Sequence, residues 1–180
     1  MTNKSTQTIA YSSILVAFGI LIPMIMPVKI IIGPASYTLA SHVPLFLAIF
    51  ISPAVAIFVS LGTTLGFFLA GFPFVIVLRA FSQIFFTLIA AFYIRNHQSQ
   101  ISSPIKALPF ALFINIIHGL GEFLVVLLFT SGQSSDVGYI WSIFLLVGLG
   151  TIVHGLVDFY LALSLWNIIL TRIGLNIKPL

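Results

Sequence analysis

The sequence predicts an all-α integral membrane protein, and its composition is the first reason. Of its 180 residues, 60% are hydrophobic and only 6% are charged, and the mean hydropathy is +1.23. A soluble domain carries about 25% charged residues, which keep its surface in water. Apolar runs of about 20 residues, the length that crosses a bilayer as a helix, recur along the whole chain. We therefore expect a single transmembrane domain over residues 1–180.

Six membrane-spanning helices fit into this length with short connections, because a hydrocarbon core of about 30 Å needs roughly 20 helical residues. We expect them at 8–27, 37–52, 53–71, 73–94, 106–130 and 140–171. The Ile-Pro-Met-Ile-Met-Pro stretch at 22–27 breaks the first helix, since proline lacks a backbone donor and clashes with the preceding turn. Residues 28–36 are then predicted to form an irregular external loop.

The basic residues predict the orientation of these helices. If both termini are cytoplasmic, five basic residues lie inside and one, Lys29, lies outside, while Arg79 falls within a span. The five are Lys4, Arg95, Lys106, Arg172 and Lys178. The opposite orientation places five charges on the wrong side, so we expect cytoplasmic termini and a cytoplasmic loop at 95–106.

Composition and missing motifs exclude several classes of function. The chain lacks cysteine, which excludes a disulfide scaffold, and its scattered basic residues do not suggest binding to nucleic acid. No G-x-x-x-x-G-K phosphate loop is present, so an energy-driven process needs an ATPase on another chain. The G-x-S-x-G and H-E-x-x-H motifs are also absent, which makes an intramembrane enzyme the weaker alternative.

Polar residues inside the expected spans are candidate functional residues, since ionisable groups are costly in hydrocarbon. Counting about 1.5 Å per residue places Arg79 and Glu122 at similar depths in the outer half of two helices. Gln83 and His118 lie one turn deeper, and Asn115 lies close by. The pattern predicts a polar strip that opens outward. An Arg79–Glu122 ion pair that only ties two helices together is the structural alternative.

Two short segments repeat a histidine and a carboxylate at positions i and i+4. They are His118 with Glu122, and His154 with Asp158. Two histidines and two carboxylates are suitable metal ligands. The helical rise, however, places the second pair about 10 Å deeper than the first. We therefore expect no metal site, interpret His154 and Asp158 as an internal hydrogen-bonded pair, and interpret His42 as a packing residue.

The architecture and a loose sequence pattern resemble a known family. Six spans in about 180 residues and a proline-broken first helix are accompanied by the stretch from Ala40-Ser41-His42-Val43-Pro44 through Gly62-Thr63-Thr64-Leu65-Gly66. Together these features resemble the substrate-binding S components of energy-coupling-factor vitamin transporters.

The resemblance implies a function and a set of partners. An S component of the prokaryotic cell membrane binds a vitamin on the outer side and docks onto a transmembrane coupling subunit served by two ATPases. ATP and magnesium then belong to those partners, and this chain needs no cofactor of its own. Docking in the family uses a strip of small residues on the first helix, which here corresponds to Ser13 and Ala17. Serine departs from the alanine of the family pattern.

The resemblance also implies which residues form the vitamin site. The implied set is Tyr37, Arg79, Gln83, Asn115, His118, Glu122, Tyr139 and Trp141. One arginine with one glutamate allows a carboxylate ligand such as nicotinate or pantothenate, and equally a neutral pyridine or pyrimidine alcohol. A stand-alone small-solute carrier is a further alternative.

Overall fold

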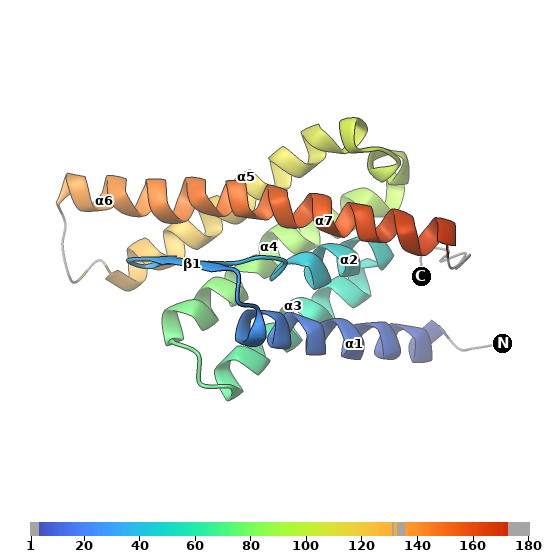
Figure 1. Ribbon diagram of the computed structural model, residues 1–180, viewed down its shortest axis with the longest axis horizontal. Coiled ribbons are helices and arrows are strands. Elements are labelled where there is room, and N and C mark those ends of the chain that lie inside the picture. Colours follow the sequence, from blue (N-terminus) through green and yellow to red (C-terminus); the bar gives the residue numbers. More distant parts are fainter. Residues whose placement is uncertain (1–3, 131, 133–135, 173–180) are drawn as a thin grey trace.

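The computed structural model describes residues 4–130, 132 and 136–172. The protein is an all-α membrane protein with one short β-hairpin (Figure 1). Four helical segments in this part of the chain are long and apolar enough to cross a bilayer. They are α1 (Lys4–Ile25), α4 (Phe74–Asn96), α5 (Pro104–Thr130) and the continuous segment Val137–Arg172. The helix α3 (Pro53–Leu69) is apolar but shorter.

The first helix ends inside the stretch where the sequence predicts a break. Pro23 lies in the last turn of α1, and the helix stops at Ile25. Here the proline removes few backbone hydrogen bonds, because the helix has almost ended. Met26 N still donates to Ile22 O at 2.9 Å, which closes the final turn.

The segment that follows α1 differs from both predictions made for it. In place of an irregular loop at 28–36, β1 (Lys29–Ile32) and β2 (Ala35–Thr38) form an antiparallel hairpin. Gly33, with φ of +55°, makes the turn, a conformation that glycine adopts without steric cost. This hairpin occupies the start of the expected span at 37–52.

The remainder of that expected span forms only α2 (Val43–Ile51). Nine helical residues are about 13.5 Å long and cannot cross a bilayer. Every residue of α2 is buried by the surrounding helices, so its apolar character reflects a protein interior and not contact with lipid. Ser52 separates α2 from α3 and caps α3, since its side chain accepts a hydrogen bond from Val55 N at 3.3 Å.

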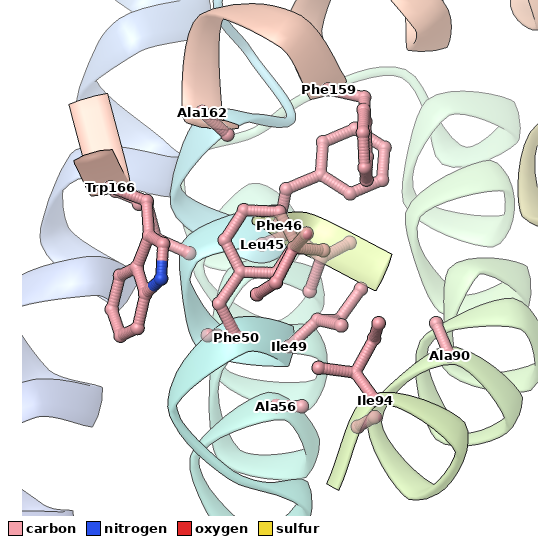
Figure 2. Close-up of a cluster of buried hydrophobic side chains, with 14 of the residues drawn as sticks. Leu45, Phe46, Ile49, Phe50, Ala56, Ala90, Ile94, Phe159, Ala162 and Trp166 are labelled. Atoms are coloured by element: carbon pink, nitrogen blue, oxygen red, sulfur yellow. The ribbon is translucent and has the colours of Figure 1, made fainter. Parts of the chain in front are cut away.

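The main hydrophobic core forms around α2 (Figure 2). Phe46 and Phe50 of α2 lie edge-on against Phe159, with ring centroids 5.3 and 5.7 Å away. Trp166 of α7 and Ile94 of α4 complete the cluster. The core lies beside the half of the bundle that contains the polar residues and fixes the position of the first turn of α2.

The last long helix contains a local irregularity. The helix α6 (Val137–Ile143) continues through a π-helical segment, η2 (Phe144–Leu149), into α7 (Gly150–Arg172). Figure 1 shows these three as one rod along the bundle. A π segment leaves some carbonyl groups without their usual helical donor, and the Tyr37 hydroxyl donates a hydrogen bond to one of them, Leu146 O.

The described ends of the chain lie at one end of the bundle. Figure 1 places the start of α1, the end of α7 and the connection between α4 and α5 on the same side, away from the β1–β2 hairpin. That connection contains η1 (Gln98–Ile101), a short 3-10 helix. These segments contain the residues expected to be cytoplasmic, and the orientation of this end in the membrane stays a prediction.

We predict that single cysteines at these two ends react from opposite sides of the membrane. Ile30 on the hairpin and Gln98 in η1 are both exposed. In intact cells, Ile30→Cys should react with a membrane-impermeant maleimide, and Gln98→Cys should react only after permeabilisation. Labelling of Gln98→Cys in intact cells would contradict cytoplasmic termini.

Candidate functional site

A cavity of about 460 Å³ lies between the hairpin, the end of α1, and helices α3 and α4. Its apolar wall includes Phe67 and Phe72, which stack on each other with ring centroids 4.5 Å apart. Its polar wall consists of hydroxyl, amide, imidazole and charged side chains. These are Lys29, Ser36, Thr38, Ser41, His42, Thr63, Arg79, Gln83 and Glu122.

Glu122 is the centre of the hydrogen bonds behind this polar wall. Glu122 is buried, with 2% of the residue exposed. Oε2 accepts from Arg79 Nε at 3.0 Å, from Arg79 Nη2 at 2.6 Å and from Thr151 Oγ1 at 2.8 Å. Oε1 lies 3.3 Å from Gln83 Nε2 and 3.2 Å from His118 Nε2. The pairing of Arg79 with Glu122 that the sequence predicts is therefore present, within a larger network.

The two terminal nitrogen atoms of Arg79, Nη1 and Nη2, face the hairpin. Nη1 lies 3.4 Å from Pro34 O, and Nη2 lies 3.5 Å from Ser36 O. Both distances are long for N–H···O hydrogen bonds. The edge of the guanidinium formed by Nη1 and Nη2 lines the cavity, and its N–H groups make only weak hydrogen bonds to the hairpin. Such an edge can bind a carboxylate through two parallel hydrogen bonds.

His42 connects the two histidine–carboxylate pairs. Its ring lies 4.8 Å from that of His118 and 5.0 Å from that of His154 between centroids. Its Nδ1 lies 3.2 Å from Asp158 Oδ2. His42 is therefore not the isolated packing residue that we expected from the sequence, because α2 begins at mid-bundle and inserts this side chain between α5 and α7.

The two pairs are also not separated in depth as the sequence analysis expects. A side chain at Gly155 of α7 would meet the Asn115 amide oxygen and His118 Nδ1 of α5, so the two motifs lie at the same level. The helical rise separates the two pairs only if both helices start at one height, and these contacts show that the helices are offset. His154 and Asp158 lie close together, with Nε2 3.3 Å from Oδ2, but the hydrogen bond of His154 Nε2 joins it to Ser41 Oγ at 3.1 Å.

Three of the eight residues proposed for vitamin binding line the cavity, namely Arg79, Gln83 and Glu122. His118 and Asn115 lie behind them and are buried. His118 contacts Glu122, whereas the Asn115 amide donates to Ala111 O at 2.8 Å within its own helix.

The other three residues lie away from the cavity. Tyr37 belongs to the hairpin, where burial raises the pKa of its hydroxyl, and this hydroxyl donates to Leu146 O in the π segment. Tyr139 packs in a small apolar cluster near Val126 and Ile143. Trp141 is 58% exposed and touches Phe144, so it lies on the outer surface of the helix rod.

Seven polar residues of the cavity wall and of the network behind it were not assigned to the site from the sequence. Lys29 was interpreted only as an external charge, and the others are Ser36, Thr38, Ser41, His42, Thr63 and Thr151. Position and spacing gave little signal for most of them, since five come from segments between residues 28 and 52 whose secondary structure was predicted differently. Thr151 could have been found, because it lies one turn before His154 on the same helix.

A comparison with curated proteins identifies the family. The chain is 40% identical over 165 residues to the "Niacin transporter NiaX" of Lactococcus lactis subsp. cremoris (strain MG1363). The match covers 91% of this chain and 74% of that protein. The chain belongs to this family of energy-coupling-factor S components. Neither a protein-family model nor a solved structure matches the chain.

Membership of the NiaX family confirms the resemblance to S components that the architecture and the sequence pattern indicate. Together with the long apolar helices, this membership shows that the chain is a multi-pass protein of the cell membrane with a role in transport.

We predict that Arg79→Ala strongly destabilises the protein. The change leaves the Glu122 carboxylate buried without its cation, a loss of about 3–5 kcal/mol in the free energy of unfolding. The double variant Arg79→Met with Glu122→Gln removes both charges and should recover most of this loss. Thermal unfolding in detergent measures both effects. Equal melting temperatures for Arg79→Ala and the wild type would show that the ion pair contributes nothing to stability.

Proposed function

We propose that this chain is the substrate-binding subunit of an ATP-driven energy-coupling-factor importer and that its ligand is niacin in the carboxylate form. The observation that carries the proposal is the cavity bordered by two cations, Arg79 and Lys29, in a chain of the NiaX family. The relative from Lactococcus lactis is named as a niacin transporter. A pyridine ring with one carboxylate matches the chemistry of the cavity walls.

The charges favour an anionic ligand over a neutral one. Glu122 accepts two hydrogen bonds from Arg79, so those two groups neutralise each other. Lys29 is exposed and donates to the uncharged Pro23 O at 3.5 Å, at the limit of a hydrogen bond, and it forms no ion pair within the described part of the chain. The cavity therefore retains the positive charge of Lys29. A ligand carboxylate can approach Lys29 and the outer edge of Arg79 together.

The apolar wall suits a flat ring. Phe67, Phe72, Val75 and Ile76 line the cavity beside the polar groups. Aromatic rings stack or meet edge-on with centroids about 4.5–7 Å apart. A cavity of about 460 Å³ lies in the ordinary range for small-molecule sites. We propose that the pyridine ring lies against the phenylalanines, with its carboxylate towards Arg79.

We further propose that α1 docks onto the transmembrane coupling subunit, with ATP and magnesium held by two partner ATPases. Ser13 and Ala17 lie on the exposed face of α1, while Ser12, Leu15 and Gly19 face the bundle. Small side chains let another helix approach closely in a membrane. The docking face is therefore distinct from the cavity.

The ligand proposal predicts which variants lose affinity. Isothermal titration calorimetry on purified protein should give binding of niacin and much weaker binding of nicotinamide, which has the same ring but no charge. Arg79→Met with Glu122→Gln should remain folded and bind niacin at least about tenfold more weakly, or about 1.4 kcal/mol. Lys29→Met should weaken niacin binding in the same direction.

Lys106→Met is the matched control for these variants. Lys106 is also exposed but lies at the start of α5, away from the cavity, so its loss should leave affinity unchanged. Normal niacin affinity in the folded double variant would refute the site. Equal affinities for niacin and nicotinamide would refute recognition of the carboxylate.

The docking proposal predicts a loss of uptake without a loss of binding. Replacing Ser13 and Ala17 together by leucine fills the space that a partner helix would occupy. Uptake of labelled niacin by cells should fall, while the purified variant keeps wild-type affinity. Ala54→Leu, at another exposed small residue, is the control and should transport normally. Unchanged uptake in the double variant would contradict docking at this face.

A further inference from the structure

Four side chains meet where the polar wall of the cavity reaches α7. They are Ser41 and His42, which precede α2, and His154 and Asp158 of α7, and we call them the His42 cluster. Ser41 and His42 line the cavity. Asp158 is fully buried, and the side chains of His42 and His154 are 11% and 10% exposed.

One atom of each side chain points to a common centre. Ser41 Oγ lies 3.3 Å from His42 Nδ1, 3.1 Å from His154 Nε2 and 3.5 Å from Asp158 Oδ2. Asp158 Oδ2 lies 3.2 Å from His42 Nδ1 and 3.3 Å from His154 Nε2. Four ligands on a tetrahedral metal with bonds of about 2.0–2.1 Å are about 3.3–3.4 Å apart. The five separations match that spacing.

The charge of Asp158 supports the same interpretation. Among the residues that the structure describes, no lysine or arginine forms an ion pair with this carboxylate, whereas Glu122 has Arg79. A buried carboxylate is normally paired with a cation or bound to a metal.

The backbone holds this carboxylate in place. Ala40 N donates to Asp158 Oδ1 at 2.8 Å, and His42 N donates to Oδ2 at 2.9 Å. Ala40 has a φ of +66°, which is unfavourable for a residue with a side chain. Outer hydrogen bonds of this kind orient the ligands of metal sites.

We propose that the His42 cluster binds one divalent transition metal ion of the zinc class. His42 Nδ1, His154 Nε2 and Asp158 Oδ2 are three of the protein ligands, and the hydroxyl oxygen of Ser41, which lines the cavity, takes the fourth position. Two imidazoles and one carboxylate form a ligand set suited to zinc or cobalt. The neighbouring group of His42, His118 and Glu122 is also compact, but the Arg79 guanidinium on Glu122 repels a cation there.

Cobalt titration of the whole chain tests this site directly. The protein is purified in detergent with a tag that contains no histidine, stripped with a chelator and titrated with Co²⁺, whose visible d–d absorption is strong in tetrahedral coordination. We expect one equivalent to bind and Zn²⁺ to displace it. His42→Gln and His154→Gln should each lower the cobalt affinity at least about tenfold, while His97→Gln, at the exposed end of α4, should not change it.

A second variant separates a ligand from a residue that only supports the fold. His154→Cys should add a thiolate-to-cobalt charge-transfer band, which appears only if residue 154 touches the metal. Absence of cobalt and zinc binding by the wild-type protein would overturn the proposal. Loss of binding in His118→Gln with retention in His154→Gln would also overturn it, since the metal would then lie at the other group.

Discussion

The burial of one carboxylate, Glu122, constrains the polar half of this protein. A charged group in the interior of a membrane protein is stable only when its oxygen atoms are paired. The groups that surround Glu122 come from three different segments, namely Arg79 and Gln83 on α4, His118 on α5 and Thr151 on α7. The carboxylate therefore sets the relative positions of these helices. Loss of its partners would leave a buried charge and not merely a weaker contact.

This constraint also shapes the proposed ligand site. Arg79 is held on one side by Glu122 and faces the hairpin with its remaining donors. A guanidinium that is already oriented loses little entropy when a ligand carboxylate binds to it. Its own charge is largely compensated, however, so the net attraction for an anion comes from Lys29. In the proposed function, Lys29 attracts the carboxylate and Arg79 orients it.

The sequence was sufficient to predict the class of protein and the central ion pair. Charged residues are so rare in this chain that Arg79 and Glu122 stood out, and the helical rise placed them at one depth. The hairpin and the short helix α2 could not be predicted in this way. A run of apolar residues has the same composition whether lipid or protein surrounds it, so hydropathy cannot distinguish the buried α2 from a membrane span.

The misplacement of α2 explains why the role of His42 was missed. As part of a span from residue 37, His42 would lie on an apolar helix near its outer end. In the structure it directly precedes Val43, the first residue of α2, and backbone N–H groups at the start of a helix are free to bond a carboxylate. The Asp158 carboxylate accepts hydrogen bonds from the backbone N–H groups of Ala40 and His42, just before this helix. A tertiary contact 116 residues away in the sequence thus determines the role of this histidine.

The hairpin links the cavity to the rest of the bundle. It contributes Lys29 and Ser36 to the cavity wall, and its Tyr37 hydroxyl reaches the π segment of the last helix rod. The Tyr37 ring packs directly against Gly150, where any side chain would clash with it. A ligand carboxylate that takes the outer edge of Arg79 competes with the hairpin carbonyl groups of Pro34 and Ser36 for the same donors. Ligand binding in the proposed function therefore changes the contacts that hold the hairpin to α4, while the Tyr37 contact keeps it anchored to α7 and η2.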